Sequence, residues 1–148
     1  MTISLLLITL SLALFAYWFR YSCFLILHTK TAEDFASEVA RANGLNFAAV
    51  RRKLEAGETS NAKELFALLQ RDYNIVTQMM DRMDSEAKEA GMLETKLLQL
   101  NFQVSQAWFR ASESLGLKCT ASALEEMAET VSHFANSFGE WNASASAA

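Results

Sequence analysis

The sequence predicts an all-α protein with one N-terminal transmembrane helix, followed by a short helical hairpin and an antiparallel three-helix bundle. Three observations predict this fold. The 148 residues include no proline and only five glycines, although sheets and their turns use both residues freely. Apolar residues in the C-terminal part recur at alternating spacings of three and four, as in amphipathic helices. Between Thr2 and His28 the only charged residue is Arg20.

The first element is predicted to be an uncleaved membrane anchor over residues 1–30. Thr2 to His28 supplies 27 positions, and a spanning helix needs about 20. A cleaved signal peptide would require a basic start, an apolar run of ~7–15 residues and small residues before the cleavage site. The chain begins "MT", its apolar run is longer, and no Ala-x-Ala closes the run. A membrane anchor therefore explains this segment better than a signal peptide.

A charged residue lies among aromatic residues within this anchor. Tyr17, Trp18 and Tyr21 surround Arg20, and such aromatic side chains favour the boundary between membrane and water. The aliphatic stem of Arg20 can lie along the helix while its guanidinium snorkels toward the headgroups. Alternatively, Arg20 pairs with a group on a neighbouring membrane subunit. Both alternatives assign these four residues to membrane anchoring.

The distribution of basic residues predicts the orientation of the anchor. No lysine or arginine precedes the span, whereas Lys30 and Arg41 follow it closely, with more at 51–53. The positive-inside rule therefore predicts a single-pass protein with its N-terminus outside and its C-terminal domain in the cytoplasm. Residues 41–53 contain four basic residues and no acidic one, which suits an anionic membrane surface. An ordinary solvated helix surface would look the same. The two cysteines, Cys23 and Cys119, are too few for a disulfide framework.

The five glycines divide the remaining chain into helical segments. A glycine often follows a helix because it tolerates the left-handed backbone of a C-terminal cap. The expected helices are 31–43, 45–56, 58–90, 92–115 and 117–138. We therefore predict a juxtamembrane helical hairpin at 31–57, a helical bundle at 58–139 and a flexible tail at 140–148. Their N-terminal caps are expected at Thr31, Asn46, Asn61 with Glu64 as a capping box, and Thr120 or Ser122.

Three apolar stripes are predicted to form the core of the bundle. Each follows the spacing of a coiled-coil seam. The third segment carries Phe66, Leu69, Tyr73, Val76, Met80, Met83, Ala87 and Ala90. The fourth carries Leu93, Leu97, Leu100, Val104, Ala107 and Ala111, and the fifth carries Leu124, Met127, Val131, Phe134 and Phe138. Helices joined by short glycine turns would close such stripes against one another.

The sequence contains no coherent set of catalytic, cofactor-binding or metal-binding residues. Glu125, Glu129 and His133 share one helical face, but such a face is more typical of a solvated stripe of ion pairs. The run "MMDRMD" could suggest copper or a methionine-rich groove, yet two of its methionines fall on the predicted seam. We therefore expect no enzyme activity, no cofactor and no small-molecule substrate.

One short pattern resembles the helix-turn-helix of bacterial repressors. It is "VARANGLNFAAVRRKL" at 39–54, in which Ala40, Gly44 and Val50 match the small, glycine and apolar positions of that motif. The resemblance implies a recognition helix capped by Asn46, with Arg51, Arg52 and Lys53 reaching DNA. Asn43 and Lys53 depart from the motif's apolar positions. The chain is also acidic overall, with a net charge of −4, which makes nucleic acid an unfavourable partner.

The predicted function is that of a non-catalytic accessory or scaffold subunit of a membrane protein complex. The anchor would fix its position in the bilayer, and the helices at 61–90 and 92–115 would contact other membrane protein subunits. The alternative is a membrane-tethered helix-turn-helix regulator that binds DNA through residues 39–54.

Overall fold

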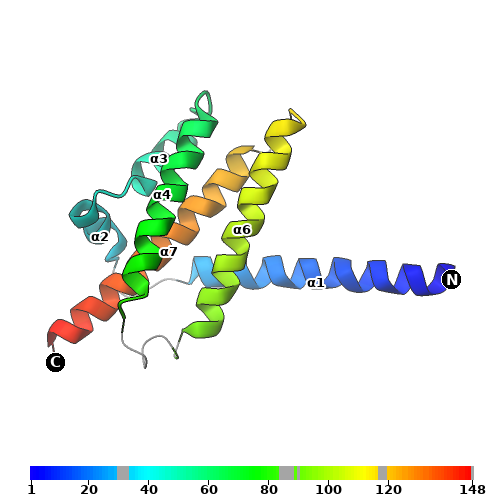
Figure 1. Ribbon diagram of the computed structural model, residues 1–148, viewed down its shortest axis with the longest axis horizontal. Coiled ribbons are helices and arrows are strands. Elements are labelled where there is room, and N and C mark those ends of the chain that lie inside the picture. Colours follow the sequence, from blue (N-terminus) through cyan, green and yellow to red (C-terminus); the bar gives the residue numbers. More distant parts are fainter. Residues whose placement is uncertain (30–33, 84–88, 90, 117–119, 148) are drawn as a thin grey trace. The chain divides into compact units, whose positions relative to one another are not determined.

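The computed structural model describes residues 1–29, 34–83, 89, 91–116 and 120–147, and within them it contains six helices and no strand. The prediction of an all-α fold is therefore confirmed. The helices are α1 (Thr2–His28), α2 (Ala36–Asn43), α3 (Phe47–Glu55), α4 (Ala62–Met80), α6 (Met92–Ser114) and α7 (Thr120–Ala147) (Figure 1). The chain divides into two compact units, Met1–Lys30 and Thr31–Ala148. We call the second unit the helical body.

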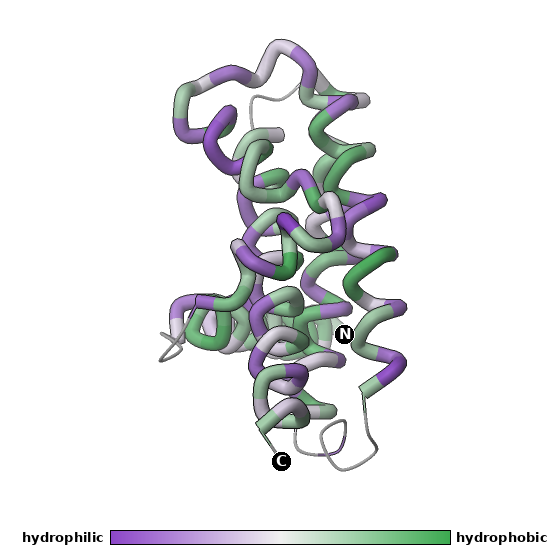
Figure 2. The backbone as a smooth tube through the Cα atoms, turned by 90° about the vertical axis from the view of Figure 1, so that its left-hand side faces the viewer, coloured by the Kyte–Doolittle hydropathy of each residue, from purple (hydrophilic) through white to green (hydrophobic). Residues whose placement is uncertain are grey.

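Helix α7 is the centre of the helical body, because α2, α3, α4 and α6 all pack against it. Helices α4 and α7 run in one direction and α6 runs in the other (Figure 1). Aromatic stacking also joins α4 to α6: the ring centroids of Tyr73 and Phe102 lie 3.8 Å apart, and those of Phe66 and Phe109 lie 4.5 Å apart. Hydrophobic and hydrophilic residues alternate in short runs along these helices, as amphipathic packing requires (Figure 2).

Three glycines end helices as predicted. Gly44, Gly57 and Gly116 have φ angles of 63°, 75° and 66°, in the left-handed region that other residues rarely adopt. At the first of them the Leu45 N–H donates to the Ala40 carbonyl oxygen at 2.9 Å, which satisfies one of the last carbonyls of α2. The left-handed turn at Gly44 lets the chain reverse between α2 and α3, which pack against each other and against α7.

The other two glycines have different roles. Gly91 is the N-cap of α6, with a φ of −110°, so it begins a helix. Gly139 lies inside α7, which continues to Ala147. The predicted helix end at 138 is therefore wrong, and residues 140–147 of the expected flexible tail are helical. A Cβ on Gly139 would lie 2.3 Å from the Phe35 Cβ, so this glycine allows the start of α2 to approach α7 closely.

Some of the predicted N-terminal helix caps are confirmed and others are not. Asn61 is the N-cap of α4, where its Nδ2 donates to Glu64 Oε2 at 3.2 Å, a contact between the two predicted partners. Helix α4 ends at Met80, so the segment predicted to reach residue 90 is shorter; residues 84–88 and 90 lie outside the described part. Thr31 is also outside it, and α2 begins at Ala36, whose N–H donates to Asp34 Oδ1 at 3.1 Å.

Candidate interaction surfaces

Helix α1 exposes apolar side chains around its whole circumference. Leu5, Leu6 and Leu7 are consecutive, point in three directions and are all more than half exposed. Among the described residues, α1 alone is long and apolar enough to cross a membrane. Two threonines bond back to the helix backbone: Thr9 Oγ1 donates to the Leu5 carbonyl oxygen at 2.5 Å, and Oγ1 of the C-cap Thr29 donates to that of Leu25 at 2.9 Å. Such back-bonding suits a helix in hydrocarbon, where water cannot supply partners.

The four predicted anchoring residues lie close together on α1. Tyr17, Trp18 and Tyr21 are exposed, and the rings of the two tyrosines stack with centroids 6.4 Å apart. Arg20 is exposed among them. Tyr17 and Tyr21 thus form a stacked pair on the helix that also carries Trp18 and Arg20. This geometry is compatible with both snorkelling and pairing.

The hairpin of α2 and α3 buries the residues that the helix-turn-helix pattern places inside. Ala40 and Val50 are buried, Gly44 makes the left-handed turn, and Arg51, Arg52 and Lys53 are exposed on α3. Arg51 also forms an ion pair with Glu55, with Nε 3.4 Å from Oε1. The three basic residues are thus accessible to a partner, although one already has an acidic neighbour.

Asn46, the other predicted nucleic-acid contact, instead bonds to Asp72 of α4. Its backbone N–H donates to Asp72 Oδ2 at 2.5 Å, and its Nδ2 lies 3.4 Å from Asp72 Oδ1. The Asp72 carboxyl is buried at the start of α3, where it caps that helix from a different element. Burial raises the pKa of Asp72, and the hydrogen bonds from the backbones of Asn46 and Phe47 only partly offset that effect.

Helix α6 has two apolar faces, and only one of them belongs to the core. Leu98, Phe102 and Phe109 are buried, together with the polar residues Asn101, Ser105 and Ser112. The Ser105 hydroxyl donates to Glu126 Oε2 of α7 at 3.0 Å. The core-facing stripe of α6 is therefore partly polar, and hydrogen bonding compensates for some of that polarity.

The stripe that the sequence assigned to the core faces outward. Leu93, Leu100 and Val104 are 74%, 47% and 42% exposed, and Ala107 and Ala111 are also exposed. Leu97 is half-buried. Trp108 and Leu115, which adjoin this stripe, are 51% and 71% exposed. We call the set Leu93, Leu97, Leu100, Val104, Ala107, Ala111 and Trp108 the outer seam. The prediction that these residues close the bundle was wrong, and they form an accessible apolar surface.

The predicted stripes of α4 and α7 agree better with the core. On α7 Leu124, Met127, Val131 and Phe134 are all buried. On α4 Leu69 and Val76 are buried as predicted, whereas Phe66 and Tyr73 are half-buried at the edge of the stripe. Leu65, Asp72 and Met79 complete the buried face of α4. Sequence reasoning thus missed Asp72, because a carboxylate at a seam position is ordinarily assigned to the surface.

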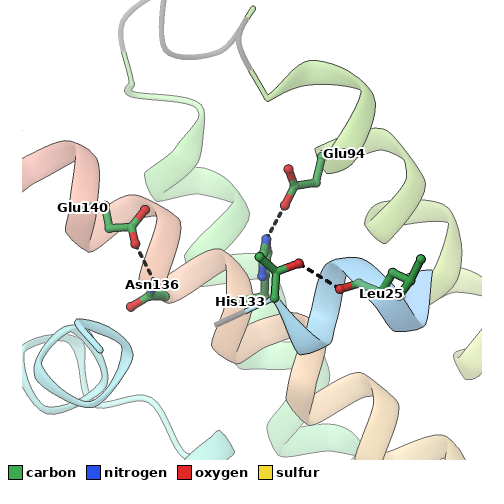
Figure 3. A network of polar contacts seen from close by, with 6 residues as sticks. Leu25, Glu94, His133, Asn136 and Glu140 are labelled. Carbon is green, nitrogen blue, oxygen red and sulfur yellow. Dashed lines mark hydrogen bonds and ion pairs between the residues drawn. The ribbon is translucent and has the colours of Figure 1, made fainter. Parts of the chain in front are cut away.

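Polar contacts also link α7 to neighbouring elements. His133 Nε2 lies 2.7 Å from Glu94 Oε1 of α6, and within α7 itself Asn136 Nδ2 donates to Glu140 Oε1 at 3.1 Å (Figure 3). Asn136 Oδ1 accepts the Phe35 N–H at 2.7 Å. Across residues 1–29, 34–83, 89, 91–116 and 120–147, no three or more His, Cys, Asp and Glu side chains are grouped to hold a metal ion.

A pocket of about 270 Å³ lies between the end of α4 and the start of α6. Its lining includes Met80 and Met83 from the methionine-rich run, and Met92, Asp81 and Lys96. Met79 from the same run is buried in the core. The methionine that packs in the core is therefore Met79, whereas Met80 and Met83, which the sequence placed on the core seam, line a small depression at the surface.

No protein-family model matches the chain, and the comparisons with curated proteins and with solved structures found no significant match.

Proposed function

We propose that the chain is a single-span membrane protein that serves as a non-catalytic accessory or scaffold subunit of a membrane protein complex. One observation carries the proposal: two separate elements, α1 and the outer seam of α6, leave extended apolar surfaces uncovered. In this proposal the bilayer covers the first surface and a partner protein covers part of the second.

The energetics of exposure support a membrane location for α1. Burying one leucine-sized side chain is worth about 1.5–3 kcal/mol, and α1 exposes more than a dozen large apolar residues. Transferring them from water into a bilayer would therefore gain more free energy than the whole stability of a small domain, which is about 5–15 kcal/mol. The orientation with the N-terminus outside and the helical body in the cytoplasm rests on Lys30 and Arg41, which follow the span, while no basic residue precedes it.

Native mass spectrometry of the tagged full-length protein, extracted from its own membranes in a mild detergent, tests this proposal. Stoichiometric companions are expected, and the chain mass should include Met1 and the anchor. Extraction by alkaline carbonate without detergent would contradict the membrane span. Release of the protein alone from detergent would contradict the role as a subunit.

Replacing Arg20 by leucine distinguishes the two roles of this residue in the assembly. If Arg20 pairs with a neighbouring subunit, Arg20→Leu should weaken co-purification of the companions, because removing one partner leaves the other charge unpaired in the membrane. Arg20→Lys, which keeps the positive charge, should retain part of the co-purification. Unchanged co-purification of Arg20→Leu would leave snorkelling as the role of Arg20.

A DNA-binding regulator is the second candidate, supported by the buried Ala40 and Val50 and the left-handed Gly44 of the hairpin. It requires salt-sensitive duplex binding by the detergent-solubilised chain, because basic side chains release counterions from DNA. The triple variant Arg51→Ala, Arg52→Ala and Lys53→Ala should abolish that binding. Absence of binding at low salt would eliminate this candidate. Asn46 contributes less to such an interface, since its side chain is directed to Asp72.

A further inference from the structure

We propose that the outer seam of α6 binds an amphipathic helix of a different protein, one that carries acidic residues along one edge. This inference rests on the proposed function, and it names the surface of the helical body and the chemistry of its partner.

The division of residues between the two faces of α6 is the first argument. The face against α7 contains Asn101, Ser105 and Ser112, whereas the outer seam is apolar at every position. If burial within this chain alone determined the sequence of α6, the more apolar stripe would be inside. Exposure of that stripe is the arrangement expected when a second helix covers it, since large contiguous apolar patches mark interaction sites.

The spacing of the outer seam specifies a helix as its partner. Leu93, Leu97, Leu100, Val104, Ala107 and Ala111 alternate at intervals of four and three. This repeat keeps a straight seam along a facing helix and along no other regular element. Helix α6 has 23 residues and is about 34 Å long, enough for three heptads. Trp108 beside the seam adds a large aromatic side chain of the kind that dominates interface energetics.

The charges beside the seam determine what kind of helix can bind. Lys96, Gln103 and Arg110 repeat every seven residues along one edge, and all three are exposed. The guanidinium of Arg110 lies 5.7 Å from the Phe66 ring centroid, so this edge is the one next to α4. The opposite edge faces α7, where Glu94 is bonded to His133. A partner with carboxylates opposite Lys96 and Arg110 would form ion pairs at both ends of the seam.

A second copy of this chain does not satisfy these charges. In an antiparallel pair, the edge containing Lys96 and Arg110 meets the same edge of the other copy, and the cations repel. In a parallel pair, that edge meets Asn101, Trp108 and Leu115, which carry no negative charge. Charge complementarity therefore favours a different protein over self-association.

Photocrosslinking in the full-length chain, in membranes of the cell that produces it, tests the inference. A photoreactive amino acid replaces Val104 in the seam or, as the control, the exposed Gln78 on α4. Val104 should give an adduct that Gln78 does not, and sequencing of the linked peptide should show heptad-spaced apolar residues with acidic residues on one edge. An adduct to a second copy, an adduct to lipid, or no seam-specific adduct would overturn the inference.

Charge reversal beside the seam tests the proposed charge complementarity separately from the crosslink itself. Lys96→Glu with Arg110→Glu should lower the yield of the Val104 adduct roughly tenfold, the equivalent of two exposed ion pairs. Arg71→Glu with Arg82→Glu, the matched reversal of two exposed basic residues on α4 and just after it, should leave the yield unchanged. Equal effects of both double variants would overturn the proposed charge complementarity. If companions still co-purify while the seam gives no adduct, the inference fails and the role as a subunit stands.

Discussion

The buried carboxyl of Asp72 connects two helices by a hydrogen bond that a short-range pattern does not reveal. It accepts from the backbone N–H of Asn46, a group that α3 itself cannot satisfy. Asp72→Ala should lower the free energy of unfolding by about 1–3 kcal/mol, because buried donors lose their acceptor. Denaturant unfolding of the full chain in micelles measures this. Asp34→Ala, which removes an exposed cap of α2, should cost less, and an equal or larger cost there would contradict the argument.

The pH dependence of stability provides a second test of the same residue. Because burial raises the pKa of Asp72 above its ordinary 3.8, the folded state holds the proton at pH values where the unfolded state has released it. The unfolding free energy, relative to that of Asp72→Asn, should therefore fall as the pH rises from 3.8 through the higher folded pKa, and then stay constant. If hydrogen bonding instead outweighed burial, the folded pKa would lie below 3.8, and the unfolding free energy would rise with pH up to about 3.8.

At position 139, the effect of glycine on stability depends on a contact with a residue that is distant in sequence. Alanine is favoured over glycine inside a helix by about 1 kcal/mol, so Gly139→Ala would be expected to stabilise α7 by itself. The added Cβ would lie 2.3 Å from the Phe35 Cβ, an atom fixed to the backbone that cannot rotate away. We expect overpacking to outweigh the gain and the variant to lose up to about 2 kcal/mol.

A double-mutant cycle in the unfolding free energy checks this explanation. Phe35→Gly removes the opposing Cβ, so Gly139→Ala should cost less in the Phe35→Gly background than in the wild type. Additive effects would show that the two positions do not interact.

At the level of elements, the sequence predicted where helices form more reliably than which face each buries. Five predicted helices of the body correspond to α2, α3, α4, α6 and α7, because glycine caps and apolar periodicity are local properties. The orientation of α6 was predicted wrongly, since periodicity selects the more apolar of two competing stripes. The contacts that bury the other stripe, such as that of Ser105 with Glu126, depend on α7. Asp72 was missed for the same reason.

Two leucines of α6, two positions apart, test which face is buried. Leu98 is fully buried and Leu100 is 47% exposed. Leu98→Ala should lower the unfolding free energy by about 2–5 kcal/mol, because it removes apolar contact and leaves a cavity. Leu100→Ala should change it by no more than about 0.5 kcal/mol. Denaturant unfolding measures both, and a larger loss at Leu100 would mean that the outer seam faces the core after all.

At the scale of the whole molecule, the two units differ sharply in composition. The anchor unit contains one charged residue among apolar ones before its end, whereas every acidic residue of the chain lies in the helical body. The sequence predicted this contrast directly, because it is a property of composition and requires no tertiary contact. The predicted orientation of the chain across a membrane rests on a second compositional property, the position of the basic residues.

The chain carries its own reporter of that orientation. Asn142-Ala143-Ser144 is an N-glycosylation acceptor, and Asn142 is exposed near the end of α7. Translated with endoplasmic-reticulum microsomes, the wild-type chain should stay unglycosylated, because the predicted orientation keeps the helical body on the cytoplasmic side. Glycosylation appears as a gain in mass that an endoglycosidase removes. A chain in which a cleavable signal peptide replaces residues 2–28 should be modified, which establishes that the acceptor is competent.

Moving the basic residues should reverse the result. Lysines in place of Ile3 and Ser4, combined with Lys30→Gln and Arg41→Gln, put the excess of positive charge before the span and should direct the body into the lumen. The modified fraction should then rise from near zero toward that of the signal-peptide chain. Glycosylation of the wild type would place the body outside the cytoplasm. The partner helix of the outer seam would then also be extracytoplasmic, and the basic side chains at 51–53 could not meet DNA in the cytoplasm.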